Sequence, residues 1–309
     1  MTMYINGSMA YDRIMNFPGV FSDSILPDKI HMMNVSFMIE RLDEKLGGCS
    51  GNIAYSLAVL GEKGVIVSCV GRDFDRYEES LKSLGLPLEG IRRCEDELTA
   101  GAYILTDQKN NQITAFNPGA MRQSTGYDFN KAVPGDIVII SPGNVEDMRS
   151  IPGIAKRKGM RCIFDPGQQL PVLTGQDLID AITGSFMLIC NDYEFELICK
   201  KTGKTESDLL GMAEYIIVTL GESGSRVQRG TTTDLVPAVP PRQVVDPTGA
   251  GDAYRSGLLK GLALGLPVLE SARIGSTTAS FCVESHGTQA PFTADECRER
   301  HAKAFGAAF

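Results

Sequence analysis

The fold is decided by the stretch DPTGAGDAY at residues 246–254, which joins an apolar, β-branched segment to a run with helical spacing. Gly249 and Gly251 let the backbone turn tightly and bring peptide N–H groups close to a ligand. A helix start carries unpaired N–H groups and the positive end of the helix dipole, so an anion can bind there. Asp252 places a carboxylate beside that anion site. An acid next to a phosphate makes chemical sense when it takes a proton from the attacking hydroxyl, which indicates phosphoryl transfer. The alternative is a plain tight turn with Asp252 as a helix-capping residue.

The composition is that of an ordinary globular protein. The chain has 309 residues, of which 43% are hydrophobic and 22% charged, and a formal net charge of −8. This size fits one large α/β domain or two smaller ones. Because there is no basic tract, we expect no nucleic-acid partner, although backbone donors can still bind a small anion.

The lack of a recognisable targeting signal and the cysteine usage both indicate a cytoplasmic protein. The N-terminus lacks the pattern of a signal peptide, and no apolar run reaches 18 residues, so we expect no membrane association. The eight cysteines are scattered without a CxxC pair, and the three histidines are far apart. Free thiols in a reducing cytoplasm are therefore expected, rather than disulfides or a metal site built on Cys or His.

Short apolar runs alternate with segments of helical period along the chain. We expect strands at 3–7, 64–70, 136–141, 161–165, 186–190 and 215–219, and helices at 50–60, 77–84, 146–158, 177–183, 193–201 and 253–264. This alternation predicts an α/β fold with a mostly parallel sheet flanked by helices on both faces. Ligands of such sheets gather at the carboxyl ends of the strands.

Two regions interrupt the alternation. Residues 31–39 form an extended run, and 100–106 and 112–117 are two strands joined by the polar turn 107–111. They predict a small β-sheet apart from the main sheet, which would act as a lid over a cleft. Since no linker or repeat divides the chain, we expect a single domain over residues 1–309, with the lid formed by residues 13–45 and 98–121.

Four more motifs lie close to expected strand or helix ends. The turn GGCSGN at 47–52 and its Asn52 suit a polyol or a phosphate. Asp12, just past the first strand, could accept hydrogen bonds from vicinal hydroxyls. Asn191 and Glu194 lie three residues apart at a helix start, which suits a hydrated Mg²⁺ near phosphates. The turn TLGESG at 219–224 would let a nucleotide approach the backbone.

Each of these motifs also has a purely structural explanation. Residues 47–52 and 219–224 could be simple turns, and Asp12 could be a solvated loop acid. Asn191 could cap a helix whose first turn contains Glu194. The sequence alone leaves both interpretations open for each motif.

In this order, the motifs resemble those of the ribokinase-like (PfkB-type) carbohydrate and nucleoside kinases. The resemblance spans almost the whole chain and is strongest at 47–52 and 246–252. It implies a Rossmann-like ribokinase fold with a small β-sheet lid. By this resemblance Asp252 is the catalytic base, and the backbone of Gly249, Ala250 and Gly251 forms the anion hole.

The resemblance also implies binding roles for other residues. Positions that hold sugar hydroxyls correspond to Asp12, Gly48 and Asn52, and part of the ATP site corresponds to Asn191, Thr219, Gly221 and Gly224. Glu194 belongs to an element tied to Mg²⁺, through water. The adenine site of ATP is expected near residues 276–288, where no motif identifies it. The family also leaves room for a monovalent cation and for a homodimer formed through the lid.

Within the family, GSMAYD (7–12), NVSF (34–37) and NQITAFNPGAM (111–121) are most similar to bacterial and archaeal adenosine or nucleoside kinases. Phe116 and Met121, with Phe37 and Met38, would give an apolar slot for a flat base. Phe37 and Met38 also fit the core of the lid. We therefore expect ATP-dependent phosphorylation of the 5′-hydroxyl of a ribonucleoside, with adenosine favoured, as in purine salvage.

Two other functions stay open. One is a ribokinase- or fructokinase-like sugar kinase, and the other is an inactive regulator that binds a nucleoside or a sugar. Tyr254 and Arg255 follow the expected base, where Phe and a small residue are more usual in sugar kinases. Residues 165–169 contain no arginine that would hold an acidic sugar.

Overall fold

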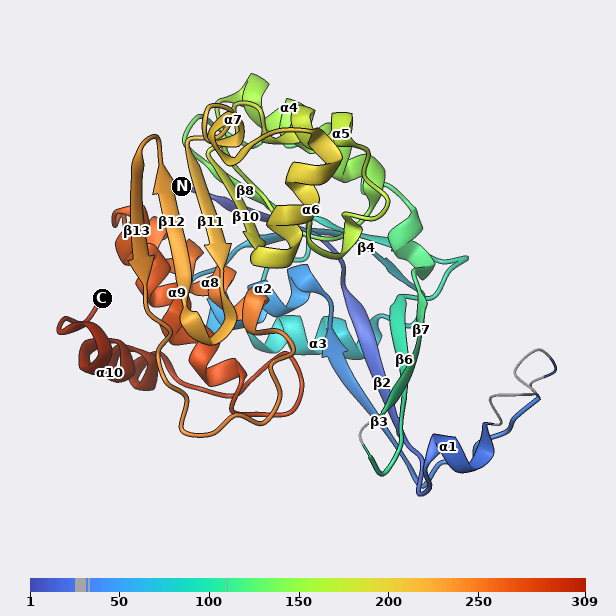
Figure 1. Ribbon diagram of the computed structural model, residues 1–309. Coiled ribbons are helices and arrows are strands. Elements are labelled where there is room, and N and C mark those ends of the chain that lie inside the picture. The colour runs from blue at the N-terminus through green and yellow to red at the C-terminus, as the bar shows by residue number, and fades with distance from the viewer. Residues whose placement is uncertain (26–31, 33, 110) are drawn as a thin grey trace.

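The computed structural model describes residues 1–25, 32, 34–109 and 111–309, which form two β-sheets and their flanking helices (Figure 1). The nine strands of the large sheet have the order β13-β12-β11-β10-β9-β8-β1-β4-β5. All neighbours from β11 to β5 are parallel, whereas β12 and β13 run antiparallel. The strands are β1 (Met3–Asn6), β4 (Val65–Gly71), β5 (Ile91–Cys94), β8 (Ile137–Ile140), β9 (Arg161–Phe164), β10 (Met187–Asn191), β11 (Tyr215–Thr219), β12 (Ser225–Arg229) and β13 (Thr232–Val236). The prediction of an α/β fold with a mostly parallel sheet is confirmed.

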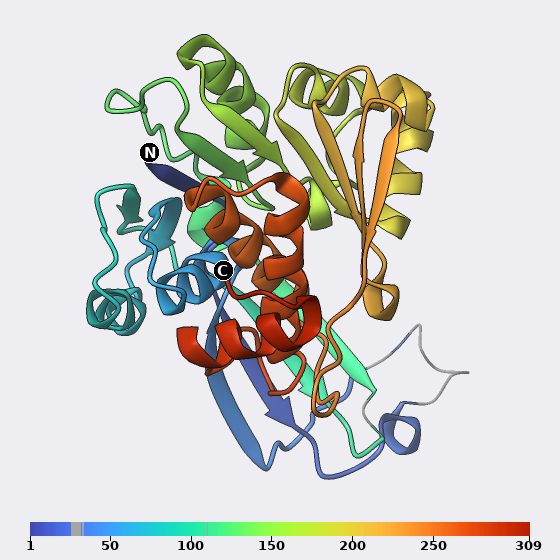
Figure 2. The same ribbon diagram turned by 90° about the vertical axis from the view of Figure 1, so that its left-hand side faces the viewer.

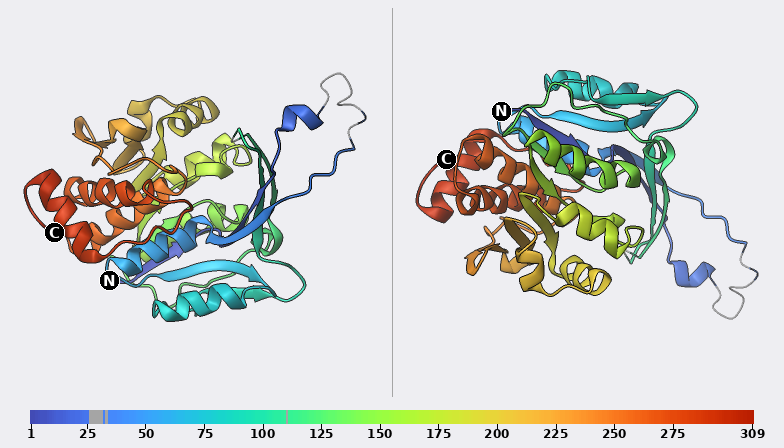
Figure 3. Two further views of the ribbon diagram at one scale, coloured as in Figure 1. Left: turned by 90° about the horizontal axis from the view of Figure 1, so that it is seen from below. Right: turned by 90° about the horizontal axis from the view of Figure 1, so that it is seen from above.

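Helices cover both faces of the large sheet (Figures 2 and 3). One group packs against the first core cluster and consists of α2 (Cys49–Val59), α3 (Asp75–Ser83), α8 (Ala250–Ala263) and α9 (Val268–Cys282), with α10 (Ala294–Phe305) packed on α9. The other group packs against the second cluster and consists of α4 (Val145–Lys158), α5 (Gly175–Ile182), α6 (Asp192–Thr202) and α7 (Glu206–Leu210). All six expected helices are present, with ends shifted by a few residues.

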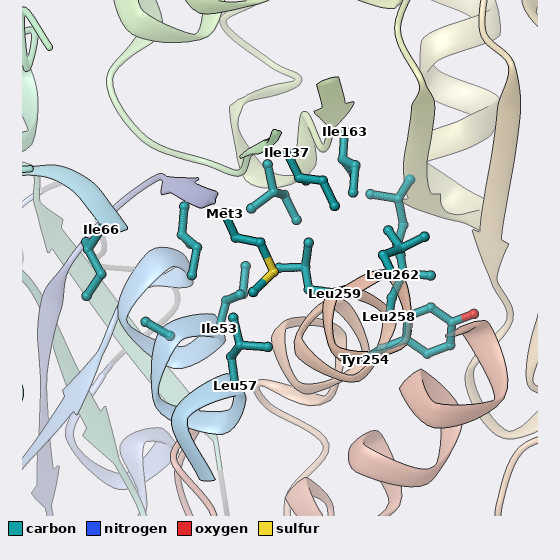
Figure 4. Close-up of a cluster of buried hydrophobic side chains, with 14 of the residues drawn as sticks. Met3, Ile53, Leu57, Ile66, Ile137, Ile163, Tyr254, Leu258, Leu259 and Leu262 are labelled. Carbon is teal, nitrogen blue, oxygen red and sulfur yellow. The ribbon is translucent and has the colours of Figure 1, made fainter. Parts of the chain in front are cut away.

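The core explains why the central strands are apolar almost throughout. Successive strand residues point to opposite faces, so Tyr4 belongs to one buried cluster and Ile5 to the other. Figure 4 shows Ile137 of β8 in the same buried cluster as Ile53 of α2 and Leu258 of α8. Both faces are buried, as expected for parallel strands covered by helices.

The two edge strands β5 and β13, and the strand β12 next to β13, were not among the expected strands. Their sequences are polar, and the middle residues of β5 and most of β13 are exposed. An edge strand of this kind has no apolar pattern that distinguishes it from a loop, and only pairing with its neighbour fixes it.

A small sheet of four strands stands apart from the large one (Figure 1). Its order is β3-β2-β6-β7, from β2 (Ala10–Asn16), β3 (Arg41–Gly47), β6 (Ala100–Thr106) and β7 (Gln112–Asn117). The bounds of β6 and β7 are those expected from the sequence. We call this sheet the lid, although its movement stays a prediction, as does the division of the chain at 13–45 and 98–121.

The other half of the lid differs from the expectation. Residues 34–39 of the expected extended run 31–39 belong to no strand, and residues 31 and 33 lie outside the described residues. The lid strands are instead β2 and β3, which carry charged residues at successive positions and were therefore not recognised. Between them lies the short helix α1 (Phe21–Ser24), far from the large sheet (Figure 3).

Two further observations concern the chain as a whole. All eight cysteines are free thiols. Within the described ranges, we find no helix that combines the length and the apolar character needed to span a membrane.

Candidate active site

A cavity of about 690 Å³ lies at the carboxyl ends of β9, β10 and β11, beside the start of α8. Nine of the residues expected in the site line it: Asn191, Glu194, Thr219, Gly221, Gly224, Gly249, Ala250, Gly251 and Asp252. This cavity therefore lies at the edge where parallel α/β sheets bind ligands.

The start of α8 forms one wall of this cavity. Gly249 is the N-cap of the helix, with φ +85 in the left-handed region. A Cβ at this position would come within 3.0 Å of Thr288 as well, so both backbone and space require glycine. The Ala250 N–H donates to the Pro247 carbonyl at 3.2 Å. The N–H groups of Gly251 and Asp252 have no carbonyl partner within the helix, and both residues line the cavity, so this helix start is a candidate anion site.

Asp252 lies at the end of this wall and is half-buried. Its Oδ2 accepts a hydrogen bond of 2.8 Å from Nδ2 of Asn52 on α2. Burial raises the pKa of Asp252 to about 6, against the opposing effects of the Asn52 bond and the Arg255 guanidinium. The carboxylate is therefore mostly ionised at neutral pH, with a proton affinity that suits a general base.

The amide of Asn52 connects Asp252 to a second polar group. Its Oδ1 accepts a hydrogen bond of 2.8 Å from Oγ1 of Thr288. The amide thus holds the carboxylate in place, a role that the sequence did not suggest. It retains one N–H and part of its carbonyl capacity, so binding of a sugar hydroxyl by Asn52 stays a prediction.

Asp12 lies in strand β2 of the lid rather than in a loop past the first strand. Burial raises its pKa, and Lys45 on the neighbouring strand opposes this. A Cβ on Gly47 would collide with the Asp12 carboxylate, so glycine there leaves room for it. Gly48, with φ +86, follows as the N-cap of α2. The Asp12 carboxylate of the lid thus lies next to Gly47, the first residue of the turn at 47–52.

The register of the lid shows which side chains share a face with Asp12. It is paired with Lys45 on β3 and with Ala102 on β6, and Ala102 is paired with Phe116 on β7. Directly paired residues point to the same side of a sheet, so Asp12 and Phe116 lie on one face. Lys45 on that face donates a hydrogen bond to the carbonyl of His286. This face of the lid therefore lies toward the loop before Thr288.

The other expected base-slot residues lie in different places. Met121 is half-buried in a short 3₁₀ helix (Gly119–Arg122) that contacts β4 and β6. Phe37 packs edge-on against Phe17 and Phe21, at centroid distances of 4.9 and 5.4 Å, so it belongs to the lid core. Met38 is 85% exposed and belongs neither to a slot nor to a core.

Asn191 and Glu194 form a reciprocal capping box at the start of α6. Asn191 Oδ1 accepts from the Glu194 N–H at 2.7 Å, and Glu194 Oε2 accepts from the Asn191 N–H at 2.8 Å. The structural interpretation of this pair is thus correct. Because both residues also line the cavity, Oε1 of Glu194 could still meet a hydrated ion.

The donor set fits Mg²⁺ only together with phosphates and water. The described residues contain no group of three or more His, Cys, Asp or Glu side chains that could hold a metal on its own. Mg²⁺ in phosphoryl-transfer sites keeps several waters and takes one or two carboxylates plus phosphate oxygens. One carboxylate beside an anion-binding helix start is compatible with that arrangement.

The expected nucleotide turn after β11 also lines the cavity. Gly221 has φ +56, and a Cβ there would meet only open space, whereas a Cβ on Gly224 would collide with the carbonyl of Val236. Gly224 is thus required by packing, and Gly221 exposes backbone to the cavity. Thr219 bonds weakly to the Cys190 carbonyl at 3.4 Å.

Apolar residues make up another part of the cavity lining. They come from α9 and from the irregular segment before α8: Ala279, Val283, Ala238, Val239, Pro241 and Val244. This part of the cavity overlaps the region 276–288 in which the adenine of ATP was expected.

Sequence reasoning missed one pair of residues in the site. Arg255 of α8 and Asp165 after β9 line the cavity and form a buried ion pair. The available signal was an arginine in a helical run, residues 253–264, whose only other charged residue is Lys260. Residues 165–169 contain no arginine, but the fold supplies one from α8.

Comparisons with known proteins agree with this geometry. The family model of pfkB carbohydrate kinases matches residues 9–295. The chain is 34% identical to a nucleoside kinase of Methanocaldococcus jannaschii, over 85% of this chain and 87% of that protein. It is 33% identical to a nucleoside kinase of Methanothermobacter thermautotrophicus, over 85% and 86%. The chain therefore belongs to the pfkB family of carbohydrate kinases, and the expected class, an ATP-dependent phosphotransferase, is confirmed.

Solved structures show the same fold. A nucleoside kinase of Burkholderia thailandensis in complex with inosine matches with a TM-score of 0.87 and 37% identity over 99% of each chain. The nucleoside kinase of M. jannaschii matches with a TM-score of 0.84 and 32% identity over 98% and 99%. A ribokinase of Thermotoga maritima, 22% identical with a TM-score of 0.81, shares the fold. The ribokinase fold expected from the sequence is confirmed.

Proposed function

We propose that this protein is a nucleoside kinase that transfers the γ-phosphate of ATP to the 5′-hydroxyl of a ribonucleoside, with adenosine preferred, as in purine salvage. The observation that carries the proposal is the position of Asp252. It lines the cavity at the strand ends and is hydrogen-bonded to Asn52, which belongs to the turn beneath the lid. A base between two binding regions can take the proton from a hydroxyl bound in one region while the oxygen attacks a phosphate bound in the other.

The reaction uses groups already described. The Asp252 carboxylate accepts the proton of the attacking hydroxyl, and the N–H groups at the start of α8 stabilise charge on the transferring phosphate. Gly221 and Gly224 leave backbone room for the ATP phosphates. The nucleoside ribose lies between Asp12, Gly48 and Asn52, and lid closure excludes water from the reaction.

Glu194 is the residue that would orient Mg²⁺, through water and from the edge of the cavity. When bound with ATP, the ion neutralises charge on the phosphates. Asn191 stabilises the start of α6 and so keeps Glu194 at this edge.

The lid face favours a nucleoside over a free sugar. Next to Asp12, the same face carries Ala102, Phe116, Ile14 and Ile104, since these positions are paired or two residues apart on the strands. A flat base would find apolar and aromatic surface there. The names of the similar kinases from M. jannaschii and B. thailandensis support the same substrate class.

A panel of acceptors with ATP tests this proposal. Adenosine, inosine, guanosine, cytidine, ribose and fructose would be compared by kcat/KM from ADP release. We expect adenosine to give the highest value and both free sugars to give values at least tenfold lower. Turnover of ribose or fructose above every nucleoside would establish the sugar-kinase alternative, and no turnover with any acceptor would favour a regulator.

A prediction for the lid concerns Phe116, which is 51% exposed without ligand. Phe116→Ala removes a surface for the base, and aromatic stacking contributes about 0.5–1.5 kcal/mol beyond area burial. We expect KM for adenosine to rise several-fold while KM for ATP stays within twofold. Hydrogen exchange of β7 and of residues 34–39 should slow when adenosine binds, because closure protects local backbone.

Leu235→Ala is the matched control for Phe116→Ala. Leu235 is an exposed apolar residue on edge strand β13, away from the lid, and should leave both KM values unchanged. A rise in KM for ATP alone, or exchange rates that adenosine does not alter, would show that Phe116 does not contact the base.

Three further features belong to the proposal. The lid face opposite Asp12 carries an apolar row formed by Leu42, Met15, Leu105 and Ile113, and we propose that it joins two copies in a homodimer. Sedimentation should give about twice the chain mass of 33.4 kDa, and a monomer mass would contradict it.

Free thiols and the use of ATP support a cytoplasmic location. Dependence on a monovalent cation would be tested by comparing rates in K⁺ and in tetramethylammonium.

A further inference from the structure

Beneath the start of α8 lies an ion pair that the proposed chemistry does not use. Arg255 donates from one terminal nitrogen to Asp165 Oδ1 at 2.7 Å, and its Nε lies 2.5 Å from Asp165 Oδ2. The Nε contact is close but outside the angle of a hydrogen bond. The two side chains are 8% and 3% exposed. Burial raises the pKa of Asp165, and the Arg255 guanidinium, which stays protonated at neutral pH, opposes this rise and favours the carboxylate.

The same arginine holds the backbone of the catalytic turn. Its other terminal nitrogen donates to the Gly251 carbonyl at 2.9 Å. That nitrogen would lie 3.0 Å from a Cβ on Gly251, so it occupies the space next to this residue. Arg255 therefore ties together the end of β9, through Asp165, and the residue that precedes Asp252.

Stability alone is a poor reason for this pair. Removing two charges from water is costly in free energy, and apolar residues of similar volume often replace buried pairs without loss of stability. The surrounding α8 residues Ala253, Leu258 and Leu259 are apolar. A buried pair at this place therefore calls for an explanation in terms of the site.

We propose that Arg255 and Asp165 are positioning residues for the catalytic turn: Arg255 fixes Gly251 and sets the charge state of Asp252, and Asp165 fixes Arg255 and offsets part of its charge. The inference rests on the proposed role of Asp252 as the base. Neither residue needs to touch a substrate for this role.

The electrostatics around Asp252 follow from its neighbours on each packed element. Arg255 on its own helix favours the ionised carboxylate, and Asp165 after β9 disfavours it. The other titratable groups near it are Cys49 on α2, Tyr77 on α3 and Cys282 on α9. Burial raises the pKa of each of these groups, so all three are neutral at neutral pH. The charged neighbours of Asp252 are thus Arg255 and Asp165, and Glu194 on α6 acts in turn on both members of the pair.

Two substitutions that break the same ion pair should therefore have opposite effects. Arg255→Met removes the cation and should move the acidic midpoint of the kcat–pH profile up from about 6. Asp165→Asn leaves the cation without its counter-charge and should move that midpoint down. We expect shifts of roughly one pH unit, since a neighbouring charge commonly moves a carboxyl pKa by about 1–3 units.

A merely structural pair gives a different result. If the pair only stabilised the fold, both variants would lower activity and melting temperature without opposite shifts in the midpoint. Equal shifts in the same direction, or no shift in either variant, would overturn the proposal. Arg255→Lys keeps the charge but loses the planar fork, so it should keep the midpoint while kcat falls about tenfold.

The test is separable from the choice of substrate. The profiles would be measured with whichever acceptor the wild-type protein turns over best. In the protein without ligands, the ¹³C carboxyl signal that disappears in Asp252→Asn gives the midpoint without turnover. A midpoint that moves up in Arg255→Met and down in Asp165→Asn in this titration would support the positioning role of the pair, even if nucleosides were not the substrates. A midpoint that is unchanged in both variants would refute it.

Discussion

Asp252→Asn is expected to lower kcat by a factor on the order of 10² to 10⁴, with KM for the nucleoside nearly unchanged. Asparagine keeps the size of the side chain and can still accept the hydrogen bond from Asn52, which is 2.8 Å long in the wild type. It cannot take the proton of the attacking hydroxyl. Steady-state kinetics with adenosine and ATP measure this effect directly.

Asp295→Asn provides the control for this substitution. Asp295 also lies in the first turn of a helix, α10, but outside the cavity, and its replacement should leave kcat unchanged. Near-normal kcat in Asp252→Asn would remove this residue from the role of base, whatever the control shows.

The stability of Asp252→Asn separates loss of chemistry from loss of fold. Folding raises the pKa of Asp252 to about 6, above the value of about 3.9 expected in the unfolded chain. The ionised carboxylate is therefore disfavoured in the folded state, and this destabilisation develops as pH rises from about 4 to 6. The variant should melt higher than the wild type at pH 8 and at the same temperature at pH 4.

The second large effect is expected at Asp12, through discrimination between adenosine and 2′-deoxyadenosine. A hydrogen bond to a charged group is worth roughly 1.5–3 kcal/mol, which corresponds to about 10- to 150-fold in affinity. We expect the wild type to favour adenosine by a factor in this range and Asp12→Ala to lose most of the preference. Binding of both nucleosides by calorimetry gives the ratio for each variant.

Asp12→Asn keeps the size of the side chain and one acceptor oxygen, so it should retain an intermediate preference. A ratio that is the same in the wild type and in Asp12→Ala would place the ribose elsewhere, despite the room that Gly47 leaves beside this carboxylate.

The parts of the fold that were predictable are those whose pattern is set by burial. Strands such as β8, buried on both faces, are apolar throughout and stand out in the sequence. Strands β2 and β3 of the lid do not, because their side chains are half-buried and alternate charged with apolar residues irregularly. Their pairing with β6, which is itself recognisable, fixes them.

The site was predictable where one short segment carries the chemistry, as in residues 249–252. It was not predictable where contacts join distant parts of the chain. The bond between Asn52 and Asp252 spans 200 residues, and the contact between Arg255 and Asp165 spans 90. Asn191 and Glu194 show a different limit, because a capping box and a Mg²⁺ element use the same residues at the same spacing.

The most direct test of the central claim identifies the phosphorylated position. ³¹P NMR of a reaction containing adenosine, ATP and Mg²⁺ should show a new phosphomonoester signal coupled to the two 5′ protons of the ribose, growing in step with ADP. This outcome is expected when the acceptor's 5′-hydroxyl is the group that faces Asp252. Growth of inorganic phosphate alone, or of a phosphomonoester on the 2′- or 3′-oxygen, would contradict the account.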